Sequence, residues 1–168
     1  MTFDMPSSPL KVKTKKADLV ATGPGGGVVL QGTTGGDFAF VCQTAEGAVT
    51  ITHSSKGESA KFNSVRNAAG LEVARIEHHM IKKWQIRMST GESIPVTSGR
   101  AMLTGHGCKI GDLAKAKAPW LAPQRYFKLT LSDELLHRPD CVVLTVVAAW
   151  VAEVNISASI SASVSSGG

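Results

Sequence analysis

Apolar and polar residues alternate in short runs along residues 28–131, and Gly, Asn or Ser separates most of these runs. Short alternating runs bounded by turn-forming residues are typical of an antiparallel sheet or barrel. The seventeen glycines favour the many turns that such a sheet needs. The predicted strands are residues 28–31, 38–43, 48–53, 59–65, 71–77, 84–88, 93–96 and 126–131.

The clearest alternation covers residues 71–78. We place Leu71 and Val73 on the apolar side of this strand and the charged residues on the other side. Residues 83–88 repeat the pattern, so we expect the two segments to pair across the turn between them.

Residues 140–156 have a different pattern, because they are apolar almost without interruption. The many valines favour a strand, but a single strand of this length is rare, and no Gly, Pro, Asn or Asp interrupts residues 141–154. We therefore predict a helix over about 140–156, with Asp140 as its N-cap after Pro139. A helix without a polar face must be surrounded on all sides, so the strands are expected to enclose it.

Composition indicates a single globular domain with two terminal extensions. The chain has 168 residues, of which 43% are hydrophobic and 18% are charged. Residues 1–18 are rich in Pro, Ser and Lys and are expected to form a flexible basic arm that carries Lys11, Lys13, Lys15 and Lys16. Residues 19–156 are expected to form the barrel domain. Residues 157–168 read as a low-complexity Ser/Ala tail.

The cysteines and the N-terminus bear on the compartment. The three cysteines form no CxxC pair, and both Cys42 and Cys141 lie in apolar segments, where we expect small core residues. The N-terminus lacks the apolar centre of a secretory signal, and the apolar run is short for a bilayer span of about 20 residues. We expect a cytoplasmic protein with a peripheral membrane contact.

Short strands followed by one wholly apolar helix near the C-terminus are similar to the tubby C-terminal-like superfamily. That superfamily includes tubby proteins, LURP-one-related proteins and phospholipid scramblases, and the chain most resembles a fungal domain of unknown function placed in it. The resemblance covers residues 38–156 and rests on residues 72–77, 125–129, 135–136 and 140–145. It implies an α+β, mainly β fold, in which a closed antiparallel β-barrel of about twelve strands surrounds the C-terminal helix.

The same resemblance implies an anionic ligand, because tubby proteins bind phosphoinositide headgroups through a basic pocket. No motif here places that pocket residue by residue, and neither the C-terminal anchor nor the calcium-binding features of scramblases can be matched.

Independently of the resemblance, the net charge of +5 favours anionic partners such as phospholipid headgroups, nucleic acid or phosphorylated ligands. Clustered cations suit phosphate oxygens, although such cations can equally form the solvated face of a strand pair. Trp120 lies beside the cations of one loop and is either an interfacial anchor or a packed loop residue. The predicted ligand-binding residues are Lys82, Lys83, Arg87, Lys115, Lys117 and Arg125.

The leading hypothesis is a non-catalytic binding protein for an anionic phospholipid or another phosphorylated ligand. One alternative is an enzyme or small-molecule-binding protein with a cleft at the barrel rim, lined by Trp84, His78 or His79, Tyr126 and Arg125. Another alternative is a self-associating structural or defence protein. Nucleic acid is less favoured because the chain has few aromatic residues on which bases can stack.

We predict no catalytic residues, no metal site and no cofactor. The adjacent His78 and His79 point to opposite faces of a strand, which makes them a poor pair of metal ligands. His106 and Cys108 lie close in sequence, but zinc needs four ligands and no others are near. Nothing in the sequence supplies an oxyanion hole for a Cys/His nucleophile.

Overall fold

The computed structural model describes residues 2–35, 38–53, 62–79, 83–97, 102–103 and 124–166 of the chain. At several strand ends and over residues 155–166 it describes the backbone alone.

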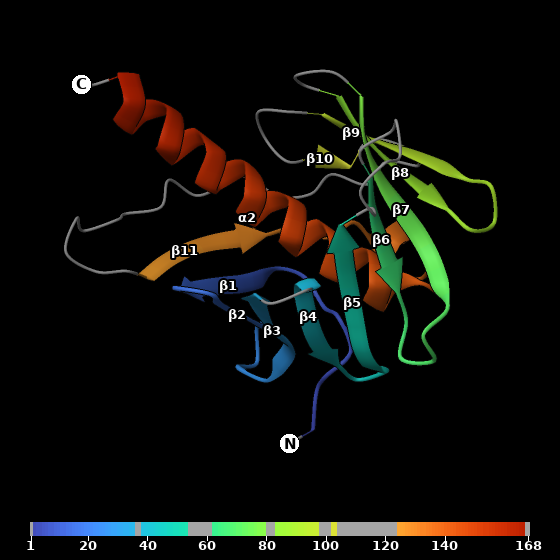
Figure 1. The fold of residues 1–168 in the computed structure, drawn as a ribbon. Helices are drawn as coiled ribbons and strands as arrows, with labels where there is room; N and C mark the ends of the chain where they lie inside the picture. Colours follow the sequence, from blue (N-terminus) through green and yellow to red (C-terminus); the bar gives the residue numbers. More distant parts are fainter. Residues whose placement is uncertain are drawn as a thin grey trace.

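One antiparallel sheet dominates the fold, and eleven strands belong to it in the described part of the chain (Figure 1). Each strand pairs with its neighbours in sequence, except that β11 pairs with β1. The strands are β1 (Leu10–Lys15), β2 (Asp18–Thr22), β3 (Val28–Gly35), β4 (Phe38–Thr44), β5 (Gly47–His53), β6 (Phe62–Arg66), β7 (Glu72–His79), β8 (Lys83–Met88), β9 (Ser93–Thr97), β10 (Met102–Leu103) and β11 (Gln124–Leu129). The helices are α1 (Asp133–Leu136) and α2 (Cys141–Ser166).

The eight strands predicted from the alternation are all present, as β3 to β9 and β11. The predicted hairpin of β7 and β8 is also confirmed, because the two strands pair as far as His79 and Lys83. Short connections between successive strands explain this sheet, since antiparallel neighbours can be joined by turns of a few residues.

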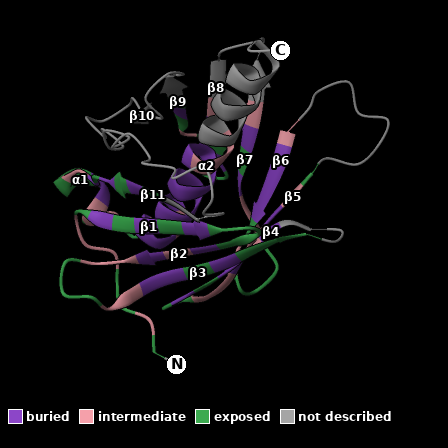
Figure 2. Cartoon of the chain, turned by 90° about the vertical axis from the view of Figure 1, so that its left-hand side faces the viewer, coloured by how far each residue is buried: buried purple, intermediate pink, exposed green. Residues whose placement is uncertain are grey.

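The apolar segment forms the first half of α2, and the helix prediction is confirmed. Between Cys141 and Ala152 every side chain is buried except that of Val143, which is half-buried. The buried polar side chain of Thr145 is satisfied locally, because its hydroxyl donates to the carbonyl of Cys141 at 2.7 Å. The strands curve around this half of the helix (Figures 1 and 2). The backbone of its C-terminal half extends past them in Figure 1.

Helix α2 is longer than the predicted 140–156, because it continues to Ser166. The segment that we read as a low-complexity tail is therefore mostly helical. Ala and Ser are acceptable in a helix, and no Gly or Pro occurs between Asp140 and Gly167. Extending an existing helix costs much less free energy than starting one, so the buried first half of α2 allows the helix to continue to Ser166.

The expectation of a flexible arm over residues 1–18 is wrong for Leu10–Lys15, which forms β1. This strand pairs with β11 on one side and with β2 on the other, so it lies inside the sheet. Its side chains alternate strictly between buried and exposed, and Leu10 and Val12 are fully buried. The core therefore depends on a segment that its Pro, Ser and Lys content had marked as mobile.

The predicted closed barrel is not confirmed. Strands β10 and β11 are the two ends of the strand order, and the described residues contain no pairing between them. A sheet closes into a barrel only when its two end strands hydrogen-bond to each other. The described sheet therefore curves around α2 but remains open.

In β7 the predicted assignment of faces is wrong. Ala74 and Ile76 are buried, whereas Val73 is half-buried and Leu71, just before the strand, is 64% exposed. Pairing sets these faces, because Ala74 lies opposite the buried Val65 and Ile76 lies opposite the buried Ile86.

No helix in the described residues combines the length and the apolar character needed to span a bilayer.

Candidate lysine-rich binding site

Strand β1 divides its residues between the core and the surface. Leu10, Val12 and Thr14 point inward. The lysines that alternate with them, Lys11, Lys13 and Lys15, therefore point outward. Residues two positions apart on a strand are separated by about 6.7 Å, so these lysines form an evenly spaced row.

The neighbouring strand β11 extends this row. Lys128 lies directly opposite Lys11, and Tyr126 lies opposite Lys13, whose Nζ is 5.8 Å from the centre of the tyrosine ring. This is the range of a cation–π contact, and it sets the exposed ring beside the lysine row. We call the surface formed by Lys11, Lys13, Lys15, Tyr126 and Lys128 the lysine face.

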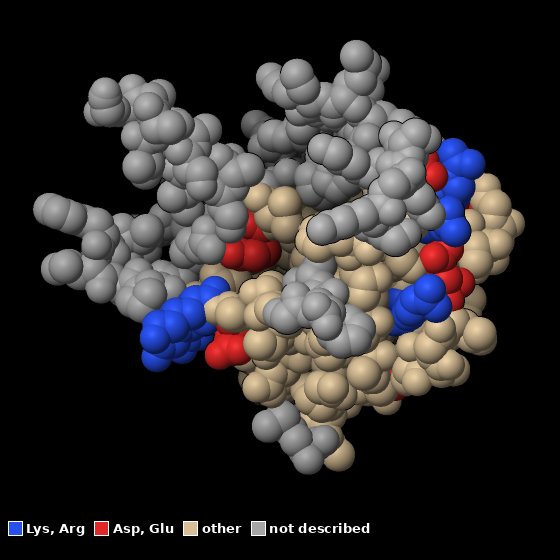
Figure 3. Space-filling model, viewed as in Figure 1, with Lys and Arg blue, Asp and Glu red and all other residues tan. Residues whose placement is uncertain are grey.

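The cations of the lysine face are not neutralised by ion pairs within the described part of the chain, where the ion pairs recorded involve arginines. Asp18 lies opposite Lys15, and its carboxylate accepts a hydrogen bond from the hydroxyl of Thr33 at 3.1 Å. Lys and Arg atoms gather over the end of β1, at the left of Figure 3. Unpaired cations on one surface create a positive potential that attracts anions.

Lys16 occupies a position that disfavours lysine. It lies in the two-residue turn between β1 and β2 with φ of 55°, in the left-handed region that favours Gly or Asn. Lys16 lines a separate pocket of about 290 Å³ together with Thr14, Trp150 and Glu153, so we do not count it with the lysine face.

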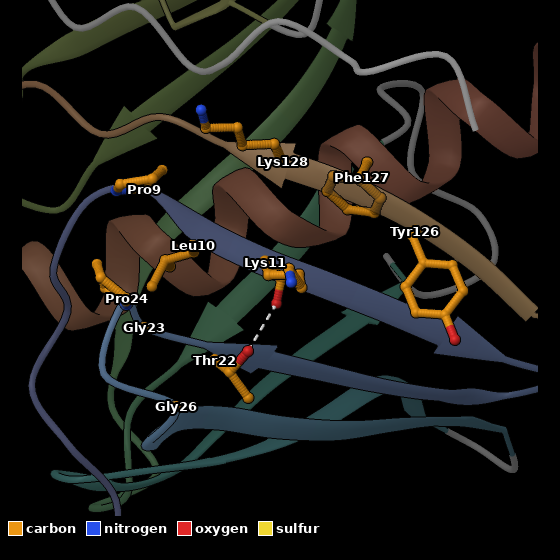
Figure 4. Close-up of a pocket in the computed structure, with 10 residues that line it drawn as sticks. All are labelled: Pro9, Leu10, Lys11, Thr22, Gly23, Pro24, Gly26, Tyr126, Phe127 and Lys128. Carbon is orange, nitrogen blue, oxygen red and sulfur yellow. Dashed lines mark hydrogen bonds between the residues drawn. The ribbon is translucent and has the colours of Figure 1, made fainter. Parts of the chain in front are cut away.

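A groove of about 690 Å³ lies beside the lysine face (Figure 4). In the close-up, Lys11 lies between two prolines at one end and the ring of Tyr126 at the other end. Strands β1, β2 and β11 supply most of the walls, and Pro9 and the loop after β2 supply the rest. The groove is lined by Pro9, Leu10, Lys11, Thr22, Gly23, Pro24, Gly26, Tyr126, Phe127 and Lys128.

The lining of the groove combines apolar residues with two positive charges. Most of the lining residues are apolar or glycine, and their only charged side chains are Lys11 and Lys128. None of the described lining residues carries a carboxylate, an imidazole or a thiol. The described residues also contain no cluster of three His, Cys, Asp or Glu that could hold a metal ion.

The structure separates the predicted ligand-binding residues. Arg87 lies in β8 and Arg125 lies in β11, far apart in the strand order. Lys83 begins β8, and only the backbone is described for Lys83 and Arg125. Lys82, Lys115 and Lys117 lie outside the described residues, as do Trp120, His106 and Cys108.

Arg87 belongs to a mixed-charge surface. Its Nε lies 3.2 Å from Oε1 of Glu77 on the adjacent strand, and its side chain is 55% exposed. Nearby, Glu72 accepts hydrogen bonds from Ser64 and Arg75. Cations and carboxylates therefore alternate on β7 and β8, which makes this surface less suited to an anion than the lysine face.

The environment of Glu72 changes its acidity. Burial raises the pKa of this carboxyl group, but the hydrogen bonds from Ser64 and Arg75 and the positive charges of Arg75 and Arg66 outweigh burial. The net effect lowers the pKa below its ordinary value of 4.5. Glu72 is thus charged at neutral pH and helps to hold β6 and β7 together.

The prediction that Cys42 and Cys141 are core residues is confirmed, because both are buried free thiols. Burial raises the pKa of Cys42 to about 12, although a backbone hydrogen bond to Gln31 opposes this shift. Burial also raises the pKa of Cys141, and the negative charges of Glu46 and Asp140 add to that effect. Neither thiol is a candidate nucleophile, since the thiolate is the reactive form.

Sequence reasoning noticed the N-terminal lysines but did not count them among the binding residues. The signal that identifies them is the alternation of residues 10–15 together with that of residues 126–129, because two such segments can pair with all their lysines on one side.

Comparisons with family models, with curated proteins and with solved structures found no match to this chain.

Proposed function

We propose that this protein is a non-catalytic binding protein for anionic ligands, and that the ligands are phospholipid or phosphoinositide headgroups. The observation that carries the proposal is the lysine face, where four lysines lie on one surface without ion pairs in the described structure. Amines arranged in this way suit phosphate oxygens, which accept charge-assisted hydrogen bonds from several donors at once. Tyr126 supports a membrane contact, since tyrosine favours the interface between water and bilayer.

The binding residues of this proposal differ from those that the sequence suggested. Of the predicted residues Lys82, Lys83 and Arg87, the structure describes the side chain of Arg87, which is paired with a carboxylate. The lysine face is the stronger candidate because its cations remain available to a ligand.

Vesicle co-sedimentation at low salt tests the proposal. Phosphatidylcholine vesicles that contain phosphatidylserine or a phosphoinositide should bind the protein, and pure phosphatidylcholine vesicles should not. Binding should weaken with salt, because exposed charges are screened within about 10 Å at 0.1 M. Absence of binding to anionic vesicles would refute the proposal, and equally tight binding to a single-stranded oligonucleotide would refute its lipid specificity.

Two charge-reversal variants identify the surface that binds. K13E/K15E and K82E/K83E each replace two lysines by glutamates and change the net charge from +5 to +1. A lysine near an anionic membrane contributes about 1 kcal/mol, so removing two from the lysine face should weaken binding at least about thirtyfold. K82E/K83E should bind much more tightly than K13E/K15E. The reverse order would assign binding to the β7–β8 hairpin.

We also infer that the domain is tubby-like, with a barrel of about twelve strands around α2. The buried, wholly apolar start of α2 and the long antiparallel sheet support this inference. A closed barrel requires partners for the edge of β11 that faces away from β1. Slow amide hydrogen exchange along that edge would support closure, and fast exchange along it would contradict closure.

A further inference from the structure

We propose that the groove beside the lysine face holds the apolar chain of one single-chain phosphate monoester, taken up as a monomer, while Lys11 and Lys128 bind its phosphate. This inference deepens the proposed function and rests on it. It concerns a different part of the ligand, because headgroup binding needs only the cations whereas the groove adds an apolar site.

The size and lining of the groove support a ligand that is partly apolar. About 690 Å³ is within the range of pockets that bind small molecules, roughly 300–1,000 Å³. The exposed side chains of Pro9, Pro24 and Tyr126 offer carbon atoms to such a ligand. A bare phosphate would leave most of this lining exposed to water.

Charge complementarity supports an anionic end on the same ligand. Lys11 and Lys128 lie directly opposite each other on paired strands, and both are exposed at the groove. No carboxylate lines the groove among the described residues. The phosphate would lie between these lysines, and the chain would run along the groove toward the prolines or toward Tyr126.

The arrangement of the exposed residues suits a single extended chain. Lys11 lies between two prolines at one end and the ring of Tyr126 at the other end, and Thr22 beside it donates a 3.4 Å hydrogen bond from its hydroxyl to the carbonyl of Lys11 (Figure 4). Leu10 and Phe127 are buried beneath this surface, so they support it without contacting a ligand. One chain that runs from the two lysines to either end would contact exposed carbon atoms along its length.

A chain-length series on the whole protein tests the proposal by calorimetry, with inorganic phosphate and butyl, hexyl and octyl phosphate below their micelle concentrations. Each buried methylene should raise affinity up to about fourfold, so hexyl phosphate should bind up to about fifteenfold tighter than butyl phosphate. Octyl glucoside, which has the chain without the charge, should bind more weakly than octyl phosphate. Equal affinities for inorganic and octyl phosphate would overturn the proposal.

Two variants separate the groove from the remainder of the lysine face. Thr22→Trp narrows the groove and leaves every lysine in place, so it should weaken octyl phosphate binding at least tenfold. K13E/K15E keeps the two lysines that line the groove and should weaken octyl phosphate binding less than Thr22→Trp does. The opposite order would overturn the proposal. The chain-length series on the unmodified protein decides the question independently if Thr22→Trp fails to fold.

The outcomes for the two proposals are distinguishable. Vesicle binding without a chain-length effect would leave the proposed function intact and would remove the groove ligand. A chain-length effect without vesicle binding would remove the membrane function and would leave a binding protein for soluble anionic amphiphiles.

Discussion

The replacement of Arg138 by methionine should destabilise the fold more than its position near the surface suggests. Arg138 connects the turn between β8 and β9 to the start of α2. Its Nη1 and Nη2 donate to the two carboxylate oxygens of Glu92 at 2.8 and 2.7 Å, and its Nε and Nη2 donate to Asp140 at 2.8 and 3.1 Å. These contacts raise the pKa of Arg138 above its usual range, so it stays charged at any practical pH.

The expected loss follows from burial and from the geometry of these bonds. The side chains of Arg138, Glu92 and Asp140 are only 22%, 25% and 29% exposed. Exposed ion pairs contribute about 0–1 kcal/mol, whereas breaking a buried pair costs about 3–5 kcal/mol. We place Arg138→Met between these limits, at about 2–3 kcal/mol. The melting temperature should then fall by roughly 4–12 °C, because 1 kcal/mol corresponds to about 2–4 °C in a chain of this size.

Urea unfolding of matched variants measures this effect. Arg87→Met is the control, because Arg87 also pairs with a carboxylate across strands but is 55% exposed, and it should lose less than about 1 kcal/mol. Arg138→Lys should give an intermediate loss, since an ammonium keeps the charge without the planar fork. Equal losses for Arg138→Met and Arg87→Met would refute the reasoning.

Three further predictions concern the core, an acidic group and the thiols. Gly32→Ala should cost about 1–3 kcal/mol in urea unfolding, because a Cβ there would overlap the buried ring of Phe40, and Phe40→Leu should recover part of the loss; an unchanged Gly32→Ala would contradict this. The lowered pKa of Glu72 stabilises the fold above pH 4.5 and loses that contribution as the pH falls. Glu72→Gln should therefore be less stable than the unmodified protein at pH 7, and the difference should shrink under acid; a constant difference would contradict it. Cys42 and Cys141 should resist iodoacetamide at pH 8 until urea unfolds the chain, and mass spectrometry of the native protein would reveal any exception.

The elements that the sequence predicted correctly are those whose pattern of apolar and polar residues was compatible with one structure. A run such as Cys141–Ala152 lacks a polar face, so it is stable only when enclosed, and the structure buries it. Strands β3 to β9 were recognised because turn residues bound them on both sides. In each case one physical requirement decided the structure without information from distant residues.

The elements that were mispredicted had two readings, and contacts distant in sequence decided between them. Residues 10–15 combine a mobile composition with a strand alternation, and pairing with β11, more than a hundred residues away, selects the strand. In β7, both Val73 and Ile76 are apolar, and only the partners on β6 and β8 determine which of them enters the core. The lysine face was absent from the predicted binding residues for the same reason, because Lys128 joins the lysines of β1 only when β1 and β11 pair.

Strand β1 contributes one set of side chains to the core and the other set to the lysine face, so the fold and the proposed function can be tested separately. Side chains on a strand alternate between faces, so the burial of Leu10 and Val12 forces Lys11 and Lys13 outward. A shift of one residue in the pairing would bury the lysines and expose the apolar side chains. Burying unpaired charges costs so much free energy that this shifted register is not populated. The register that builds the core thus also sets the spacing of the lysine row. Because the lysines contribute little to the core, reversing their charge should abolish anion binding while the melting temperature stays nearly unchanged. A large drop in that temperature would mean that the lysine face belongs to the folding of the sheet rather than to ligand binding.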